Sequence, residues 1–313
     1  MIYPLAPKAG STIGLIAPAG YIDEEKLKAS IGNIASLGFK PYFLPSILDT
    51  YGQFAGSDQR RLDELMHMFT NPEVRAIFCV RGGSGTNRIL NKIDYSAIAQ
   101  DPKVFVGYSD ITALHHAILK KSDLITFHGP MASSRWTKYS KMQLNRAVFD
   151  LDSRFDILLY DEKSKEKHDR YSIFNGSASA PIVGGNLSIV SSLIGTDFEI
   201  NFDNKIVFLE DVSEEPYRID RMLGQFILAH KFDKVKGIAF GIFKDCEPEH
   251  LEHSLSLKET LFDRLKDLKI PMAYGFQFGH ITDNCTIPQG ANAFLDTSKM
   301  LLRIERDSNE FYA

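Results

Sequence analysis

The chain has 313 residues, of which 44% are hydrophobic and 24% are charged. At about 150 residues per domain, this length favours two domains, each with a core of its own. The net charge is −4, and no cluster of lysine and arginine predicts a nucleic-acid surface. No apolar run reaches the roughly 18 residues that a membrane-spanning helix needs. We therefore expect a globular protein that binds neither nucleic acid nor membrane.

The cysteines indicate a reducing compartment. Cys79, Cys246 and Cys285 are far apart in the sequence, and three cannot all pair. No CxxC or Cys/His cluster predicts a zinc site, so we expect reduced, buried thiols and no metal. The first residues lack the basic start, apolar stretch and small-residue cleavage site of a secretory signal. We expect a cytoplasmic protein.

The first 130 residues alternate between short apolar strands and helices. Because the strands are apolar on both faces, we predict a parallel sheet covered by helices on each side. This is an open α/β domain of the flavodoxin-like or amidotransferase-like kind, whose ligands bind at the carboxyl ends of the strands. The predicted elements are a strand at 12–17, a helix at 23–37, a strand at 40–45, a helix at 59–68, a strand at 76–80, a helix at 86–90, a strand at 104–106 and a helix at 111–119.

The remainder of the chain follows a different pattern. We assign residues 1–135 to the N-terminal α/β domain, 136–178 to a linker or exposed crossover, and 179–313 to a C-terminal α+β domain. The linker contains one modest helix and a charged, poorly patterned stretch. The predicted elements are a helix at 142–151, a strand at 180–183, a Gly-Gly-Asn turn at 184–186, a helix at 187–193, a strand at 205–209, a helix at 216–230, a strand at 237–243, a helix at 255–268, a strand at 272–276 and a hairpin over 293–305.

Ser109 lies between a predicted strand and a predicted helix, in the sequence GYSD. A serine in such a turn presents its hydroxyl at the carboxyl edge of the sheet, beside the unpaired N–H groups of the helix start. This is the logic of a nucleophile elbow, although the usual G-x-S-x-G pattern is absent. The N–H of Asp110 would then contribute to an oxyanion hole. The alternative is an N-cap serine, which is common and is favoured by this feature alone. We interpret His115 and His116, in the following helix, as packing or surface residues.

A glycine-rich loop, Arg81-Gly82-Gly83-Ser84-Gly85, follows the third predicted strand. Its glycines let the backbone approach a ligand, and exposed N–H groups can bind an anion. The pattern matches neither the P-loop nor the dinucleotide-binding fingerprint. The loop either supplies a second oxyanion donor or is a tight turn that requires positive φ angles.

Glu210 and His280 are candidates for an acid and a base. Glu210 ends an apolar strand, where a solvated charge is unusual, and a carboxylate there can hold a histidine in one tautomer. His280 lies in a loop after a strand and beside a glycine, a position that suits a base. Asp211 is a rival for the acid, and His128, before a Gly-Pro turn, is a rival for the base. Taken singly, each is as well explained by an ordinary loop residue.

Together these features resemble one family, the serine LD-carboxypeptidases, a group that includes the muramoyltetrapeptide carboxypeptidases and the microcin C immunity peptidases. The resemblance covers nearly the whole chain, with the blocks in the family's order. The blocks are TIGLIAPAG (12–20), AGSDQRRLDEL (55–65), NPEVRAIFCVRGGSG (71–85), FVGYSDITALHH (105–116), FHGPM (127–131), VGGNLSIVSSLIGT (183–196), FLEDVSEEPYRIDRML (208–223) and YGFQFGH with TIPQGA (274–291).

The resemblance implies a catalytic triad that is assembled across the two domains. Its nucleophile would be Ser109, its base His280 and the acid that orients the base Glu210. The implied reaction is removal of the terminal D-alanine from a murein tetrapeptide through an acyl-enzyme, in peptidoglycan recycling. The family also implies a homodimer that needs no metal or cofactor.

The resemblance further implies an oxyanion hole made by the backbone of Asp110 and of the Gly82-Gly83 turn. One departure is visible, because the carboxypeptidase branch commonly has an aromatic residue at the position of Ser84. A carboxypeptidase must also hold a free carboxylate, for which arginine is the usual partner. Arg218 and Arg221 fit a solvated ion-pair lattice better. The candidates for substrate contact are Arg81, Arg88, Arg218, Arg221, Ser84 and His128.

Two other functions stay open. An immunity-type amidase would cleave a peptide–nucleotide or acyl–amino acid conjugate with the same triad and a different pocket, although the RGGSG loop favours the carboxypeptidase. A flavodoxin-like binding module without chemistry would use Ser109 as a helix cap and the glycine loop as a phosphate cradle. The binding module leaves Glu210 and His280 unexplained.

Overall fold

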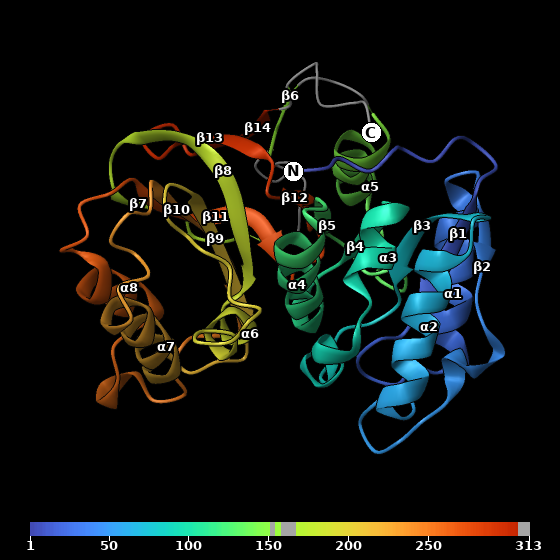
Figure 1. Cartoon of the computed structure of the whole chain (residues 1–313). Coiled ribbons are helices and arrows are strands. Elements are labelled where there is room, and N and C mark those ends of the chain that lie inside the picture. Colours follow the sequence, from blue (N-terminus) through green and yellow to red (C-terminus); the bar gives the residue numbers. More distant parts are fainter. Residues whose placement is uncertain (151–153, 158–166, 306–313) are drawn as a thin grey trace. The chain divides into compact units, whose positions relative to one another are not determined.

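The computed structural model describes residues 1–150, 154–157 and 167–305, which divide into two compact units. The first unit holds the residues up to 150 together with the segment Thr286–Gln289. The second unit holds the other described residues. Figure 1 follows the chain through both units. Near its C-terminal end the chain returns to the first unit, to which Thr286–Gln289 belongs.

The first unit is built on a six-stranded sheet in the order β12-β5-β4-β3-β1-β2. The run from β5 to β2 is parallel, and β12 pairs antiparallel with β5. The strand order reverses between β1 and β3, and the loops that follow these two strands meet at the carboxyl edge where open sheets bind ligands. The strands are β1 (Thr12–Ile16), β2 (Lys40–Tyr42), β3 (Val74–Cys79), β4 (Val104–Gly107), β5 (Thr126–His128) and β12 (Ile287–Gln289).

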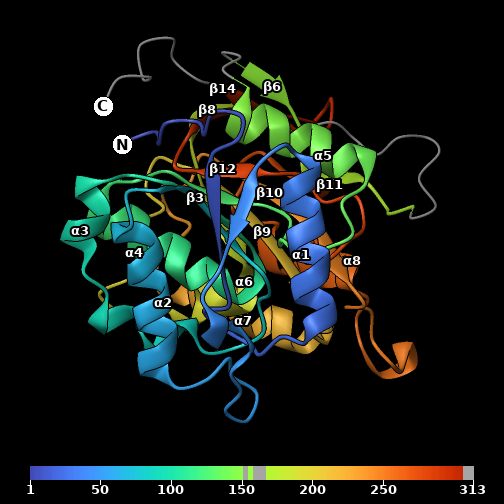
Figure 2. The same ribbon diagram turned by 90° about the vertical axis from the view of Figure 1, so that its right-hand side faces the viewer.

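Helices cover both faces of this sheet. In Figure 2, α1 lies to one side of β1 and β2, whereas α2, α3 and α4 lie to the other. Helices α1 and α2 begin where the sequence supplies a cap. The side chain of Asp23 accepts the N–H of Lys26 at α1, and that of Ser57 accepts the N–H of Arg60 at α2. The helices are α1 (Glu24–Ser36), α2 (Asp58–Thr70), α3 (Tyr95–Gln100), α4 (Thr112–Ser122) and α5 (Lys138–Leu144).

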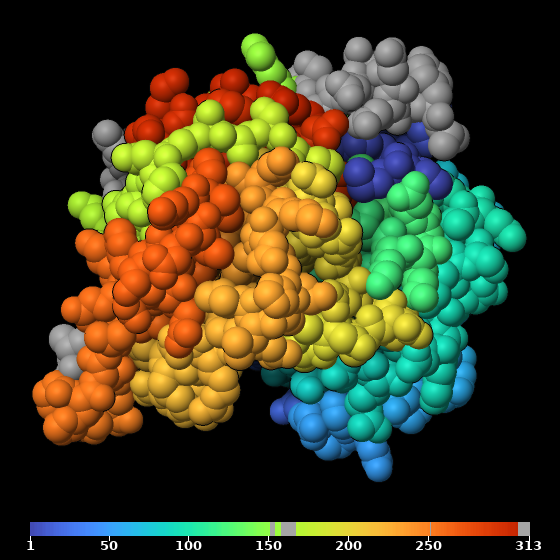
Figure 3. Space-filling view, turned by 60° about the vertical axis from the view of Figure 1, so that its left-hand side comes forward, coloured from blue at the N-terminus to red at the C-terminus, as the bar shows by residue number. Residues whose placement is uncertain are grey.

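The second unit contains an eight-stranded sheet in the order β6-β14-β13-β8-β9-β10-β11-β7. Its centre, β8 to β11, is parallel, and antiparallel strands flank it on both sides. Figure 1 shows the helices together on one side of β9, β10 and β11. In the space-filling view of Figure 3, the red β13–β14 hairpin lies along the yellow-green β8. The elements are β6 (Arg154–Asp156), β7 (Tyr171–Phe174), β8 (Ser177–Asn186), α6 (Leu187–Ser192), β9 (Ile206–Val212), α7 (Pro216–Leu228), β10 (Gly237–Lys244), α8 (Leu257–Leu265), β11 (Met272–Gly279), β13 (Asn292–Asp296) and β14 (Leu301–Glu305).

The predicted fold class is confirmed, with a helix-covered parallel sheet followed by a second, mixed sheet. The three cysteines are free and buried, as predicted. Among the described residues, every helix is too short or too polar to span a bilayer. The predicted helix at 142–151 instead begins at Lys138 and continues as a π-helical turn over Asn145–Phe149. The stretch assigned to the linker also contains β6 and β7, while its residues 158–166 lie outside the described residues.

Two local predictions are wrong. The predicted helix at 86–90 is a pair of 3₁₀ turns, and the N–H and hydroxyl of Thr86 donate to Asp110. The predicted turn at 184–186 is instead the end of β8. A Cβ atom on Gly184 would lie 1.8 Å from the carbonyl oxygen of Phe208, so this glycine marks the close approach of β8 to β9.

We predict that Gly184→Ala lowers the free energy of unfolding by about 4 kcal/mol or more, because the two strands must separate to admit the methyl group. Gly32→Ala is the matched control, since nothing lies within 4 Å of the added Cβ in α1. Its alanine should raise stability by about 0.5–1 kcal/mol through helix propensity. Urea unfolding followed by circular dichroism measures both changes. Equal stability of the two variants would contradict the pairing of β8 with β9.

Candidate active site

Ser109 has the backbone of a strained turn and not that of a helix cap. Its φ angle is 61°, in the left-handed region that residues other than glycine seldom adopt and that recurs at functional sites. Its 3₁₀ turn, Ser109–Ile111, follows Tyr108, and no side chain caps it. The half-buried hydroxyl makes no hydrogen bond within the described residues. These features favour the nucleophile elbow over the N-cap interpretation.

His115 fixes the end of β4, two residues before Ser109. Its Nε2 donates to the carbonyl of Gly107 at 2.8 Å, and its Nδ1 accepts the hydroxyl of Thr126 at 2.8 Å. Burial lowers the pKa of His115 to about 4. The ring is therefore neutral, and the carbonyl partner requires the proton to be on Nε2. This histidine, interpreted from the sequence as a packing or surface residue, is a buried support of the elbow.

Asp110 joins the elbow to the glycine loop. Its Oδ2 accepts the N–H of Thr86 at 2.9 Å, and its carbonyl accepts the hydroxyl of Thr86 at 2.7 Å. Burial raises the pKa of Asp110, and hydrogen bonding by Thr86 to the carboxylate opposes that effect. The pair fixes residues 81–86 relative to Ser109.

Gly82 brings the glycine loop against the serine. A Cβ atom on Gly82 would lie 3.1 Å from Ser109 Oγ and 2.9 Å from Ser109 Cβ. The Gly82 carbonyl accepts the N–H of Gly20 at 3.0 Å. Because the C=O and N–H of a trans peptide point in opposite directions, the N–H of Gly83 points away from Gly20. This exposed group donates to no acceptor among the described residues, as an oxyanion donor requires.

Arg61 ties together the loops that follow β1 and β3. It is fully buried, and its Nη1 donates to the carbonyl of Pro18 at 2.9 Å and to that of Gly85 at 2.8 Å. Nearby, Glu64 accepts the N–H of Ala17 at 2.8 Å. Side chains of helix α2 thus bind the backbone of the loops that follow β1 and β3. The strand order reverses between these two strands, and the candidate residues of the first unit lie there.

Glu210 and His280 meet in the second unit. Glu210 lies within β9 and is completely buried, whereas His280 follows β11 with its side chain 19% exposed. Their Oε2 and Nδ1 atoms are 2.8 Å apart. Since a carboxylate only accepts, Nδ1 carries the proton and Nε2 is the nitrogen that can take another. Burial lowers the pKa of His280, but the hydrogen bond and charge of Glu210, with the charge of Asp211, outweigh it and raise that pKa.

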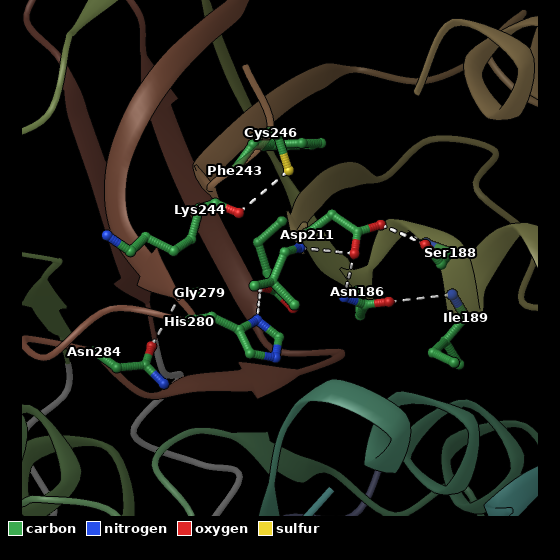
Figure 4. Close-up of polar contacts among 12 residues, drawn as sticks. Asn186, Ser188, Ile189, Asp211, Phe243, Lys244, Cys246, Gly279, His280 and Asn284 are labelled. Carbon is green, nitrogen blue, oxygen red and sulfur yellow. Dashed lines mark hydrogen bonds and ion pairs between the residues drawn. The ribbon is translucent and has the colours of Figure 1, made fainter. Parts of the chain in front are cut away.

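Asp211, the rival acid, is engaged elsewhere, as Figure 4 shows. Its Oδ1 accepts from the side chain of Asn186 at 2.9 Å and from the N–H of Val212 at 2.8 Å. Its Oδ2 accepts the N–H of Ser188 at 2.9 Å and the hydroxyl of Ser188 at 2.6 Å. These bonds fix the ends of β8 and β9 and the start of α6. Asp211 is a structural carboxylate, which leaves Glu210 as the acid beside the histidine.

Gly279 allows His280 to approach Glu210. Its φ angle is 124°, and a Cβ atom would lie 3.1 Å from Glu210 Oε2 and 2.8 Å from the carbonyl of Ile242. Its N–H donates to the side chain of Asn284 at 3.2 Å, a contact that is visible in Figure 4. A residue with a side chain at this position would displace the carboxylate, the strand or both.

The other predicted contact residues lie in different surroundings. His128 is fully buried in β5, with its ring 6.0 Å from that of Tyr108, and burial leaves it no surface to offer a substrate. Ser84 is exposed in the glycine loop. Arg88 donates through Nε to Asp58 at 2.8 Å.

On α7, Arg218 pairs with Glu214 at 3.6 Å, and Arg218 and Arg221 both lie over the ring of Tyr217. Of the ion pairs expected on this face, the structure contains the pair of Arg218 with Glu214, whereas Asp220 pairs with Arg264.

Gly20, Arg61 and Thr86 are supporting residues that the sequence interpretation did not single out. One signal was present for Arg61, because it lies four residues before Leu65 and therefore on the apolar face of its helix. An arginine on such a face must find buried acceptors. The bonds of Gly20 and Thr86 depend on loops from distant strands and leave no local pattern.

We predict that the ring of His280 titrates above 6.5, the ordinary histidine pKa, and that Glu210→Gln lowers its pKa because the amide removes the negative charge. NMR titration of the ring C–H signals measures both values. The control is Glu214→Gln, which removes a carboxylate that does not contact His280 and should leave the pKa unchanged. A His280 pKa that is the same with and without the Glu210 charge would contradict the pairing.

Comparison with known proteins relates both units to one family. The model described as the LD-carboxypeptidase N-terminal domain matches residues 13–129, and that described as the LD-carboxypeptidase C-terminal domain matches residues 179–295. A protein of Bacillus subtilis (strain 168) described as a probable murein peptide carboxypeptidase is 38% identical over 307 residues, 98% of this chain and 95% of that protein.

Two solved structures share the fold over almost their full lengths. An MccF-like protein from Bacillus anthracis str. Ames has a TM-score of 0.87 and 27% identity, with 98% of this chain and 100% of that chain covered. A muramoyltetrapeptide carboxypeptidase from Oxalobacter formigenes has a TM-score of 0.82 and 26% identity, with 95% and 99% covered. With both domain models matched and a full-length relative at 38% identity, this chain belongs to the LD-carboxypeptidase family.

Proposed function

We propose that the protein is a serine carboxypeptidase that hydrolyses the L,D-peptide bond before the terminal D-alanine of murein tetrapeptides. The observation that carries the proposal is the 2.8 Å contact between the buried carboxylate of Glu210 and Nδ1 of His280. This contact holds the ring in the tautomer that a base needs. The strained, unbonded Ser109 is the nucleophile that such a base would serve. Membership of the LD-carboxypeptidase family supports the proposed murein substrate, as does similarity to a relative described as a probable murein peptide carboxypeptidase.

Acylation follows from these assignments. His280 Nε2 takes the proton from Ser109 Oγ as the oxygen attacks the scissile carbonyl carbon, and Glu210 stabilises the imidazolium that forms. The negative charge moves to the carbonyl oxygen, which accepts the N–H groups of Gly83 and Asp110. Each such donor contributes about 3 kcal/mol in comparable sites.

Collapse of the tetrahedral intermediate breaks the C–N bond. His280 returns its proton to the amine of the departing D-alanine, which leaves the tripeptide as an ester on Ser109. A water molecule then attacks the ester with His280 as its base, and the tripeptide leaves as the serine regains its proton. The cleaved bond joins an L-configured centre to a D-residue, so the surrounding pocket and not the triad must select the substrate.

We also propose that the protein acts in the cytoplasm on fragments of recycled peptidoglycan, and that it is a homodimer, as the family resemblance implies. Light scattering of the purified protein tests the dimer.

We predict that the wild type removes one alanine from a muramoyl tetrapeptide that ends in D-alanine, and that Ser109→Ala lowers the rate by about 10⁴-fold or more, because the nucleophile is absent. Mass spectrometry of the peptide over time measures the loss. The matched control is Ser36→Ala, at an exposed serine of α1, which should keep the wild-type rate.

Absence of cleavage by a folded wild type would contradict the proposed substrate. Cleavage of a peptide–nucleotide conjugate in place of the tetrapeptide would indicate the immunity-type amidase. Full activity of Ser109→Ala would contradict the assignment of the nucleophile.

A further inference from the structure

A carboxypeptidase differs from other serine peptidases in one requirement: it must recognise the free carboxylate of the residue that leaves. We propose that Arg81 binds this terminal carboxylate and thereby restricts the enzyme to peptides with a free C-terminus. The inference rests on the proposed function and names the residue that determines its specificity. Arginine suits the task because its planar fork of N–H groups matches the two oxygens of a carboxylate.

Arg81 lies at the start of the glycine loop. It directly precedes Gly82, whose added Cβ would lie 3.1 Å from Ser109 Oγ. The side chain of Arg81 stays beside this loop: a Cβ on Gly20 would lie 3.5 Å from Arg81 Cζ, and one on Gly83 would lie 4.0 Å from Arg81 Nε. The guanidinium therefore flanks the peptide that carries the candidate oxyanion donor.

This position matches the chemistry of the substrate. The carboxylate of the leaving residue is attached to the Cα next to the scissile bond, and neighbouring Cα atoms are about 3.8 Å apart. A cation that recognises this group must lie within about one residue of the oxyanion site. Arg81 borders the Gly82-Gly83 peptide on the side that faces Gly20, and its Nε would lie 4.0 Å from a Cβ on Gly83.

Arg81 is held in place yet keeps free hydrogen-bond donors. Its Nη1 donates to the carbonyl of Tyr21 at 2.7 Å, and its Cζ lies 5.4 Å from the centre of the Tyr21 ring. No carboxylate among the described residues lies within salt-bridge distance of it. Nε and Nη2 are therefore free to meet a ligand, and the anchored side chain loses little freedom when it does so.

The other arginines near the glycine loop are already committed. Arg61 is fully buried and donates to two backbone carbonyls. Arg88 shares the carboxylate of Asp58 with Arg61. Arg81 is thus the arginine of this group that is anchored by a backbone carbonyl and has no carboxylate among the described residues within salt-bridge distance.

The test compares two substrates and three enzymes. The substrates are the tetrapeptide with a free D-alanine carboxylate and the same peptide with a C-terminal carboxamide, which have the same scissile bond. For the wild type, kcat/KM should be on the order of 10²-fold higher for the acid, the usual size of a lost charge-assisted pair. Arg81→Met should lose most of this preference, because it should lower kcat/KM for the peptide acid and leave kcat/KM for the carboxamide unchanged. Arg88→Met, the matched control, should keep it, and Arg81→Lys should keep part of it.

Two failures can be told apart. If Arg81→Met slows acid and amide by the same factor, the residue supports the loop and does not bind the carboxylate, and the inference is overturned while the proposed function stands. If a folded wild type cleaves neither peptide, the proposed function fails and this inference fails with it. Calorimetric titration of both peptides into Ser109→Ala, with and without Arg81→Met, adds a binding measurement that needs no turnover. Tighter binding of the peptide acid than of the carboxamide, lost in Arg81→Met, would also support the inference.

Discussion

The hydrogen bond between Glu210 and His280 is the interaction on which the proposed chemistry depends. Glu210 is completely buried, and its Oε1 has no hydrogen-bond partner within the described residues. The histidine is therefore the group that offsets the cost of removing this carboxylate from water. A buried acid with a single partner serves stability poorly, and Gly279 is needed to admit even that partner. Such local costs concentrate at functional sites, so the pair marks a candidate functional site.

The first unit shows the same preference for function over local stability. Ser109 has a left-handed backbone, and the glycine loop approaches it so closely that Gly82 admits no side chain. The surroundings hold both features in place, with Arg61 bound to the loops after β1 and β3, and with the side chain of Asp110 bound to Thr86. A preorganised set of donors of this kind can stabilise developing charge without rearranging during the reaction.

Elements with a clear apolar periodicity could be predicted from the sequence, whereas features that depend on contacts between distant segments could not. The helices at 23–37 and 59–68 and the strand at 104–106 have strong apolar patterns, and the structure contains all three. Strands β5 and β12 were not predicted, and β12 is defined by its antiparallel pairing with β5, a segment far away in the sequence. The turn expected at 184–186 shows that a glycine pair can mark a close strand contact as well as a bend. Glu210 and His280 are 70 residues apart (280 − 210), and only the family resemblance joined them before the structure did.

The central claim is that His280 of the second unit serves Ser109 of the first. The most direct test is a crystal structure of the wild-type protein, in which the distance between Ser109 Oγ and His280 Nε2 is measured. The account predicts a separation of about 3 Å, or one that closes to it when a tetrapeptide binds. A histidine that stays paired with Glu210 but points away from the serine, in both the free and the bound protein, would contradict it.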